Sequence, residues 1–448
     1  MSLDNLPVEW LNVKISDVTV KGEQRKPNDS EEFIYVDIGS INRDLKKIES
    51  PQFLLGKDAP SRARKVIKSG DILVSLTRPN LNAVALVGEN YDQQIASTGF
   101  EVISAMFVES KYLFSLVRTQ NFINEISKQE QGALYPAAKS SDVQAYEFPL
   151  PPLAEQQEIV RQLDVMLAQV EQIKARLDAI PAILKKFRQS VLESYFNNLA
   201  SVQQVNLDDL VVSIDQGWSP KCLNTPASAE QWGVIKTSAI QPLYFDASEN
   251  KELPSNLKPR EALSLISGDV LITRAGPRAR CGVTCIVDKD YDNLMICDKV
   301  YRVRCDSKKI SADYLNLYLN SLTGLSLIEK MKTGSSESGM NLTQSKFKEL
   351  VIPLVSLKQQ LAFAKDIKKF FQLANHIEET VQSAQKRVNL LTQSILAKAF
   401  SGELTAEWRE QHQELITGIN SAESLLAKIQ AEREASKPVK KTRVKKEA

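Results

Sequence analysis

The chain has 448 residues, 43% of them hydrophobic and 25% charged, which is enough for two or three domains with buried cores. Its formal net charge of +2 provides no overall basic field, so nucleic-acid binding would have to use local patches. No apolar run is long enough to span a membrane, and the first residues lack the regions of a signal peptide. The five scattered cysteines favour a reducing compartment, so we expect a cytoplasmic protein without a disulfide framework.

Residues 1–148 are predicted to form a first globular block, in which short apolar runs alternate with Gly, Pro and Asn turns. Two of these runs, Ile72–Val74 and Ala83–Val87, indicate strands. The loop between them, "TRPNLN", carries side chains that can read base edges, because Arg pairs with guanine and Asn with adenine. The candidates are Arg78, Asn80 and Asn82, although a solvated polar hairpin explains the loop equally well.

Residues 149–204 are predicted to form a long helix, which starts behind the prolines of "PLPPLAEQQEIVRQLD". Pro181 should kink or restart this helix, because proline cannot donate a hydrogen bond to the preceding turn. Apolar residues alternate at spacings of four and three, which is typical of a coiled-coil seam. The seam includes Ile159, Leu163, Val170, Leu177, Leu184 and Val191.

Residues 205–352 are predicted to form a second globular block that repeats the first loosely. "SGDVLI" parallels the earlier "SGDILV", and strands are expected at Val270–Ile272 and Val283–Val287. The loop between these strands, "TRAGPRARCG", also carries side chains that can read base edges, although a solvated polar hairpin explains it equally well. Its candidates are Arg274, Gly276, Arg278 and Arg280, where the glycine would let the backbone approach a phosphate.

Residues 353–404 are predicted to form a second long helix, shifted from the first by 204 positions (353 − 149). The shift holds without a gap, and apolar residues recur at the matching positions. This second half of the seam includes Phe363, Ile367, Ile377, Val381, Val388 and Ile395. The chain is therefore a tandem duplication of one globular-plus-helix unit.

Residues 405–448 are predicted to form a C-terminal helix followed by a basic tail. Leu415, Ile419, Leu425, Leu426 and Ile429 lie along one side of a candidate amphipathic helix from Ala406 to Glu434. The tail, "VKKTRVKKEA", is expected to be disordered or to touch DNA non-specifically.

Catalytic signatures are scarce in this sequence. It has no P-loop, no dinucleotide-binding glycine turn and no adenine-methyltransferase tetrapeptide. The two histidines fall in predicted helices and are interpreted as surface residues. Cys281, Cys285, Cys297 and Cys305 match no zinc-finger spacing, so packing residues are favoured over a metal site. The sequence predicts a binding protein, not an enzyme, with no catalytic, cofactor-binding or metal-binding residues.

The chain resembles the specificity (S) subunits of type I restriction-modification systems. The resemblance rests on "PLPPLAEQQEIV" before a long helix, the helix end "RQSVLESYF", its partner "TQSILAKAFSGELTAEW", and each "SGD" strand followed by an arginine. It covers essentially the whole chain. It implies an α+β protein with two α/β target-recognition domains, separated by two long antiparallel coiled-coil-like helices.

The resemblance also implies partners. Each recognition domain would read one half of a bipartite, asymmetric site in double-stranded DNA. The helices would set the spacing and dock two modification (M) methyltransferase subunits, which restriction (R) subunits would join. S-adenosylmethionine, ATP and Mg are expected on these partners, and no cofactor on this chain. Two alternatives stay open: the specificity component of a complex that only methylates, and a duplicated coiled-coil scaffold that does not read DNA.

Overall fold

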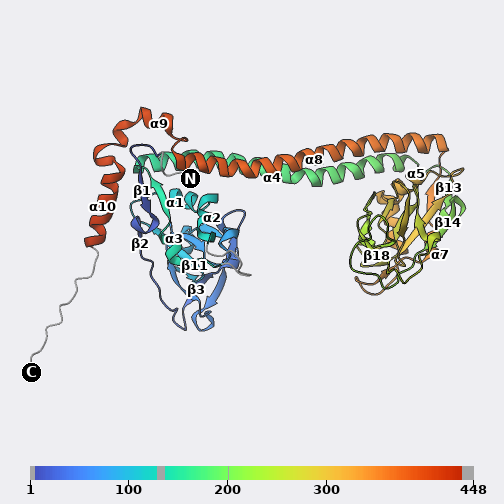
Figure 1. Cartoon of the computed structure of the whole chain (residues 1–448), viewed down its shortest axis with the longest axis horizontal. Helices are drawn as coiled ribbons and strands as arrows, with labels where there is room; N and C mark the ends of the chain where they lie inside the picture. Colours follow the sequence, from blue (N-terminus) through green and yellow to red (C-terminus); the bar gives the residue numbers. More distant parts are fainter. Residues whose placement is uncertain (1–5, 129–136, 200, 436–448) are drawn as a thin grey trace, which may run out of the picture. The chain divides into compact units, whose positions relative to one another are not determined.

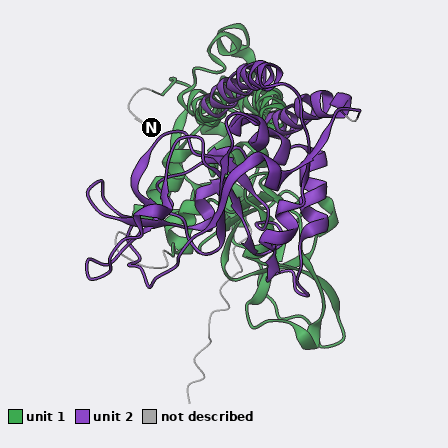
Figure 2. Ribbon diagram, turned by 90° about the vertical axis from the view of Figure 1, so that its right-hand side faces the viewer, with its two compact units in different colours: residues 1–177, 384–448 green, residues 178–383 purple. Residues whose placement is uncertain are grey.

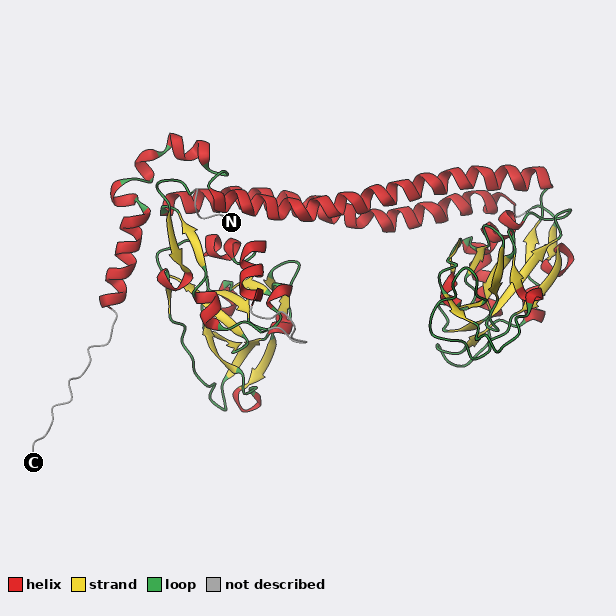
Figure 3. Ribbon diagram, in the orientation of Figure 1, coloured by secondary structure: helices red, strands yellow, loops and turns green. Residues whose placement is uncertain are grey.

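The computed structural model describes residues 6–128, 137–199 and 201–435 (Figure 1). The chain divides into two compact units, residues 1–177 with 384–448 (unit 1) and residues 178–383 (unit 2), which Figure 2 shows in separate colours. Both boundaries fall inside long helices. Each unit therefore combines one globular block with part of both helices. Figure 3 colours the helices and strands of the chain separately.

The globular block of unit 1 contains two four-stranded sheets, ordered β6-β3-β10-β7 and β2-β11-β8-β9. Only the β3–β10 pair is parallel among the described strand pairs of these two sheets. The strands are β2 (Thr19–Val20), β3 (Glu32–Val36), β6 (Gln52–Leu55), β7 (Ala63–Ile67), β8 (Ile72–Ser75), β9 (Val84–Leu86), β10 (Gln94–Ser97) and β11 (Phe100–Ala105).

Three short helices and two strand pairs complete this block. The hairpin of β4 (Ile41–Asn42) and β5 (Lys47–Ile48) is antiparallel, and so are the paired strands β1 (Leu11–Lys14) and β12 (Glu147–Leu150). The helices are α1 (Ser110–Leu116), α2 (Gln120–Ser127) and α3 (Ser140–Gln144).

Unit 2 repeats this topology strand for strand, with sheets ordered β18-β15-β23-β19 and β14-β24-β20-β22. Here too the central pair of the first sheet, β15–β23, is parallel. The predicted duplication of the globular blocks is thus confirmed, as are the strands expected around positions 72, 84, 270 and 284. The strands are β14 (Val211–Gln216), β15 (Gly233–Ile235), β18 (Asn250–Glu252), β19 (Ser264–Leu265), β20 (Val270–Thr273), β22 (Thr284–Ile286), β23 (Tyr291–Met295) and β24 (Val300–Cys305).

The smaller elements of unit 2 also have counterparts in unit 1. The strand pair β13–β26 corresponds to β1–β12, and the hairpin β16–β17 corresponds to β4–β5. These elements are β13 (Gln204–Asn206), β16 (Ile240–Gln241), β17 (Tyr244–Phe245), β21 (Ala275–Gly276), β25 (Met340–Asn341), β26 (Val351–Pro353), α5 (Ala312–Leu319), α6 (Leu322–Met331) and α7 (Gln344–Lys348).

The two long helices are α4 (Leu153–Phe196) and α8 (Leu357–Ser401). Helix α4 continues through Pro181 without ending, so of the predicted kink or restart the restart is excluded, and the kink stays a prediction. Proline removes one backbone donor, but the residues on either side keep the helical conformation.

In each unit the two helix segments run antiparallel. In unit 2, the Phe196 ring packs 5.3 Å from that of Phe363 (centroid to centroid), and Phe187 lies 6.3 Å from Phe370. Residues later in α8 therefore contact residues earlier in α4, as antiparallel helices require. In unit 1, α4 packs by Ile159 and Leu163 into the core that contains Leu396 and Phe400 near the end of α8.

The segment after α8 belongs to unit 1. It forms two helices, α9 (Ala406–Gln411) and α10 (Ala422–Ala435), separated by 3-10 turns. The single amphipathic helix predicted here is therefore wrong. Leu425 and Ile429 enter the core of unit 1, whereas Ile419 is 91% exposed on the intervening turn. The basic tail lies outside the described residues.

Among the described residues, no helix has both the length and the apolar character needed to cross a membrane.

Candidate nucleic-acid interface

The candidate loop of unit 1 follows β8 and contains a 3-10 turn, Pro79–Leu81. Arg78 and Asn82 flank this turn with φ angles of 49° and 45°, in the left-handed region that non-glycine residues seldom occupy. Arg78 and Asn80 are exposed. The Asn82 side chain is buried instead, and its amide donates to the Val117 carbonyl at 2.8 Å. Asn82 thus holds the loop against the domain.

Lys46, at the end of the β4–β5 hairpin, ties that hairpin to the same loop. Its Nζ donates to the Asn82 carbonyl oxygen at 2.6 Å. Burial, together with the positive charge of Arg118, lowers the pKa of Lys46 to about 8. Hairpin and loop therefore form one rigid edge. Sequence patterns could not single out Lys46, because each strand of its hairpin has only two residues.

In unit 2 the corresponding hairpin and loop are also joined, but the donating side chain comes from the loop instead of the hairpin. The Arg280 guanidinium on the loop donates to the carbonyl oxygens of Thr237 and Ile240, both at 2.6 Å. Arg274 is also engaged internally, since its Nη1 donates to the Asp298 carbonyl at 2.9 Å and its guanidinium lies over the Tyr301 ring. These two candidates hold the loop in place. Their proposed contacts with DNA stay a prediction.

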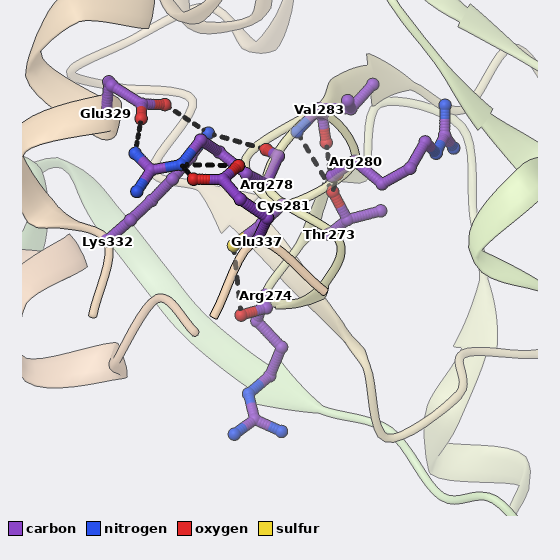
Figure 4. Close-up of polar contacts among 9 residues, drawn as sticks. All are labelled: Thr273, Arg274, Arg278, Arg280, Cys281, Val283, Glu329, Lys332 and Glu337. Atoms are coloured by element: carbon purple, nitrogen blue, oxygen red, sulfur yellow. Dashed lines mark hydrogen bonds and ion pairs between the residues drawn. The ribbon is translucent and has the colours of Figure 1, made fainter. Parts of the chain in front are cut away.

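Gly276 and Arg278 present the open part of this loop. Gly276 has a φ of 142° and no atom within 4 Å of the position a Cβ would take, so a ligand could approach its backbone. The Arg278 side chain is 44% exposed and forms ion pairs with Glu329 and Glu337 (Figure 4). Hydrogen bonds to these carboxylates raise the pKa of Arg278.

A third segment borders the loop in both units. In unit 2, β21 pairs with β25, so the residues before α7 lie against the Arg278 loop. In unit 1, Thr77 and Ala137 form an isolated bridge at the corresponding place. Each unit therefore presents an edge made of a loop, a hairpin and the segment before a short helix.

Residues 62–68, "RARKVIK", form a basic run that contains β7, and one of its cations points into the domain interior. Lys65 pairs with Glu101 at 3.0 Å, and both side chains are largely buried. Glu101 also accepts from Gln144 at 2.7 Å. Lys65 therefore stabilises the fold, which leaves fewer cations in this run to contact phosphate.

Most residues of the predicted helix seam are buried. Ile377 is 36% exposed and the remainder are half-buried. The buried ones are Ile159, Leu163, Val170, Leu184, Phe363, Ile367 and Val381, and the half-buried ones are Leu177, Val191, Val388 and Ile395.

The cysteines pack in the cores of unit 2, as predicted. Cys281 lies in one apolar cluster, and Cys285 and Cys297 lie in another. Burial raises the pKa of the Cys297 thiol to about 11, which keeps it protonated. Within the described ranges, no group of three or more His, Cys, Asp or Glu residues is arranged to hold a metal ion.

Comparison with known proteins identifies the family. Residues 7–182 and 219–384 match the type I restriction modification DNA specificity domain, so each of the two units contains most of one match. This chain belongs to the type I restriction-modification specificity subunits. The predicted family and fold class are confirmed.

Full-length relatives support the assignment. The chain is 30% identical to the type I restriction enzyme EcoKI specificity subunit of Escherichia coli K12, over 99% of this chain and 100% of the relative. It is 29% identical, over the same shares, to the StySPI specificity subunit of Salmonella potsdam.

Solved structures agree. The HsdS subunit from Thermoanaerobacter tengcongensis is 28% identical, with a TM-score of 0.58 over 90% of this chain and 99% of that one. A chain from work on complex assembly and conformational transition of a type I R-M system is also 28% identical. It has a TM-score of 0.69 over 89% of this chain and 99% of its own length.

Proposed function

We propose that this specificity subunit reads a bipartite, asymmetric site in double-stranded DNA, with one half-site for each unit. The observation that carries the proposal is the repeated edge of loop, hairpin and adjoining segment, which each unit builds from a different sequence. Two edges with the same backbone plan and different side chains suit two half-sites of different sequence.

The long helices are proposed to dock two M subunits, and R subunits are proposed to join that core. Exposed apolar side chains on the helices support such docking, because soluble surfaces seldom keep them without a partner. Among them are Ile183 (60% exposed), Leu373 (54%) and Leu390 (71%). We assign S-adenosylmethionine, ATP and Mg to the partner subunits, and no catalytic step to this chain.

Selection from random duplexes tests the reading function. The chain, assembled with its M subunits, should enrich a two-part motif with a fixed gap. Absence of any enriched motif would favour a scaffold that does not read DNA.

A tritium-transfer assay tests the division of labour. The purified chain alone should transfer no label from S-adenosylmethionine to DNA, and addition of M subunits should start the transfer. Transfer by the chain alone would contradict the assignment of catalysis to the partners.

A further inference from the structure

Arg278 is held by two carboxylates at the open edge of unit 2. Its Nε donates to the two oxygens of Glu337 at 2.9 and 3.1 Å, and its Nη1 donates to Glu329 at 2.5 Å. Figure 4 shows the guanidinium between these two acids. Guanidinium donors of this kind would also bind the acceptor edge of a guanine or a phosphate. The acids therefore occupy the groups that Arg278 would use on DNA.

The arrangement can open without disturbing the fold. All three side chains are well exposed, at 44% for Arg278 and Glu329 and 79% for Glu337. Exposed ion pairs are weak, because water solvates both partners well when they separate. The backbone of the loop is fixed independently, since the Arg278 amide donates to the Glu337 carbonyl and Lys332 Nζ donates to the Arg278 carbonyl. Only the Arg278 side chain has to move.

The two acids would not be left in the same state when Arg278 moves. Glu329 keeps a second cation, because Lys332 Nζ donates to its other oxygen at 2.5 Å. The Glu337 carboxylate makes no further side-chain hydrogen bond or ion pair within the described part of the chain. Departure of Arg278 would thus leave a bare negative charge on the segment that borders the loop.

We propose that Glu337, assisted by Glu329, is an internal counter-ligand that suppresses binding of non-cognate DNA by the second recognition edge. The proposal rests on the DNA-reading function proposed above. A duplex can use Arg278 only if it displaces the Glu337 carboxylate, which is then left without a partner among the described residues. Only a site that offers hydrogen-bond acceptors to Arg278 compensates for the ion pairs that it loses. Specificity then comes from a repulsive element as well as an attractive one.

The test uses the chain assembled with its M subunits and compares affinities for cognate and random duplexes. The variant Glu337→Gln should bind random duplex about fivefold more tightly at 0.1 M salt, because Arg278, released from this carboxylate, can then contact the phosphates of any sequence. Cognate affinity should rise less, so discrimination falls. Glu261→Gln is the matched control, since it removes one exposed charge from the same unit at a residue outside this ion-pair cluster.

The variant Arg278→Gln identifies the acceptor. If Arg278 reads guanine, this variant relaxes one position of the second half of the motif. If Arg278 binds phosphate, it weakens all duplexes uniformly and lowers the salt slope by about one charge. In the double variant, the effect of Glu337→Gln should largely disappear, because the carboxylate no longer competes for Arg278.

Two results would overturn the counter-ligand: a Glu337→Gln variant that behaves as Glu261→Gln does, or a gain in affinity that persists undiminished without Arg278. Failure of the proposed function looks different. In that case the unmodified complex itself shows no preference between cognate and random duplexes.

Discussion

The two units share one contact at the start of their long helices and differ at the position next to it. Gln156 accepts from the Glu109 amide at 2.9 Å, and Gln360, 204 residues later, accepts from the Ser311 amide at 2.8 Å. The residue before each glutamine differs. Glu155 is fully buried, whereas Gln359 is exposed, and its side chain hydrogen-bonds only with nearby Ser356 among the described residues.

Glu155 joins the two ends of unit 1. Its carboxylate accepts from Trp10 Nε1 at 2.8 Å, from Thr405 Oγ1 at 2.7 Å and from Arg409 Nε at 2.9 Å. Gly402 is required close by, because a Cβ there would lie 2.5 Å from the Pro7 ring. Unit 1 is interrupted by unit 2 and therefore needs such a junction. Unit 2 is continuous and does not.

Charges in the apolar helix contacts should have the largest effects, and these should be alike in the two units. Leu163→Asp and Ile367→Asp each bury a carboxylate in a core, since the native side chains are 1% and 3% exposed. Each change should cost several kcal/mol, roughly 3–5, in the free energy of unfolding of its own unit. Urea unfolding followed by fluorescence measures this cost.

The exposed Val165→Asp variant provides the control, because Val165 is 51% exposed on the same helix. It should unfold like the parent protein. Equal stability of Leu163→Asp and Val165→Asp would show that the helix contacts of unit 1 are wrong.

Substitution at Glu155 should affect unit 1 more than the matching substitution at Gln359 affects unit 2. Glu155→Ala leaves the Arg409 guanidinium and the Trp10 indole without their buried acceptor, which should cost about 3 kcal/mol. Gln359→Ala removes an exposed side chain and should cost about 0.5 kcal/mol. Hydrogen exchange should show faster exchange in the segment 405–435 for the first variant alone. Similar losses for both variants would mean that the two positions are equivalent.

A smaller effect than that of Glu155→Ala concerns a contact that both units share. Tyr112 donates to the Pro149 carbonyl at 2.8 Å, and Tyr314 donates to that of Pro353 at 2.6 Å. Replacing either tyrosine by phenylalanine leaves a buried carbonyl unpaired, at a cost of about 1 kcal/mol. Calorimetry should find the same cost in both units. Unequal costs would show that the two units share a backbone arrangement but not the energetics of this buried contact.

Sequence patterns predicted the features that depend on local chemistry repeated many times. The apolar positions from Ile159 to Ile395 revealed the duplication, because a seam needs the same side-chain type at every turn. Single long-range contacts could not be predicted in this way. Arg280 has the same chemistry whether it meets a guanine or the Ile240 carbonyl, 40 residues away. Glu155 likewise gave no sign that its partners are at the two ends of the chain.

Replacement of the second recognition block by the first tests the central claim, that each unit reads one half-site, most directly. Residues 204–353 would be exchanged for residues 12–149, which matches the paired strands β13–β26 to β1–β12 and keeps both helices and the Glu155 junction. Methylated-adenine sequencing, in a host that also expresses the M subunits, then reports the recognised site. The account predicts an inverted repeat of the first half-site with the original gap, since a duplicated chain with two identical readers is expected to recognise a palindrome. An unchanged asymmetric motif would contradict it.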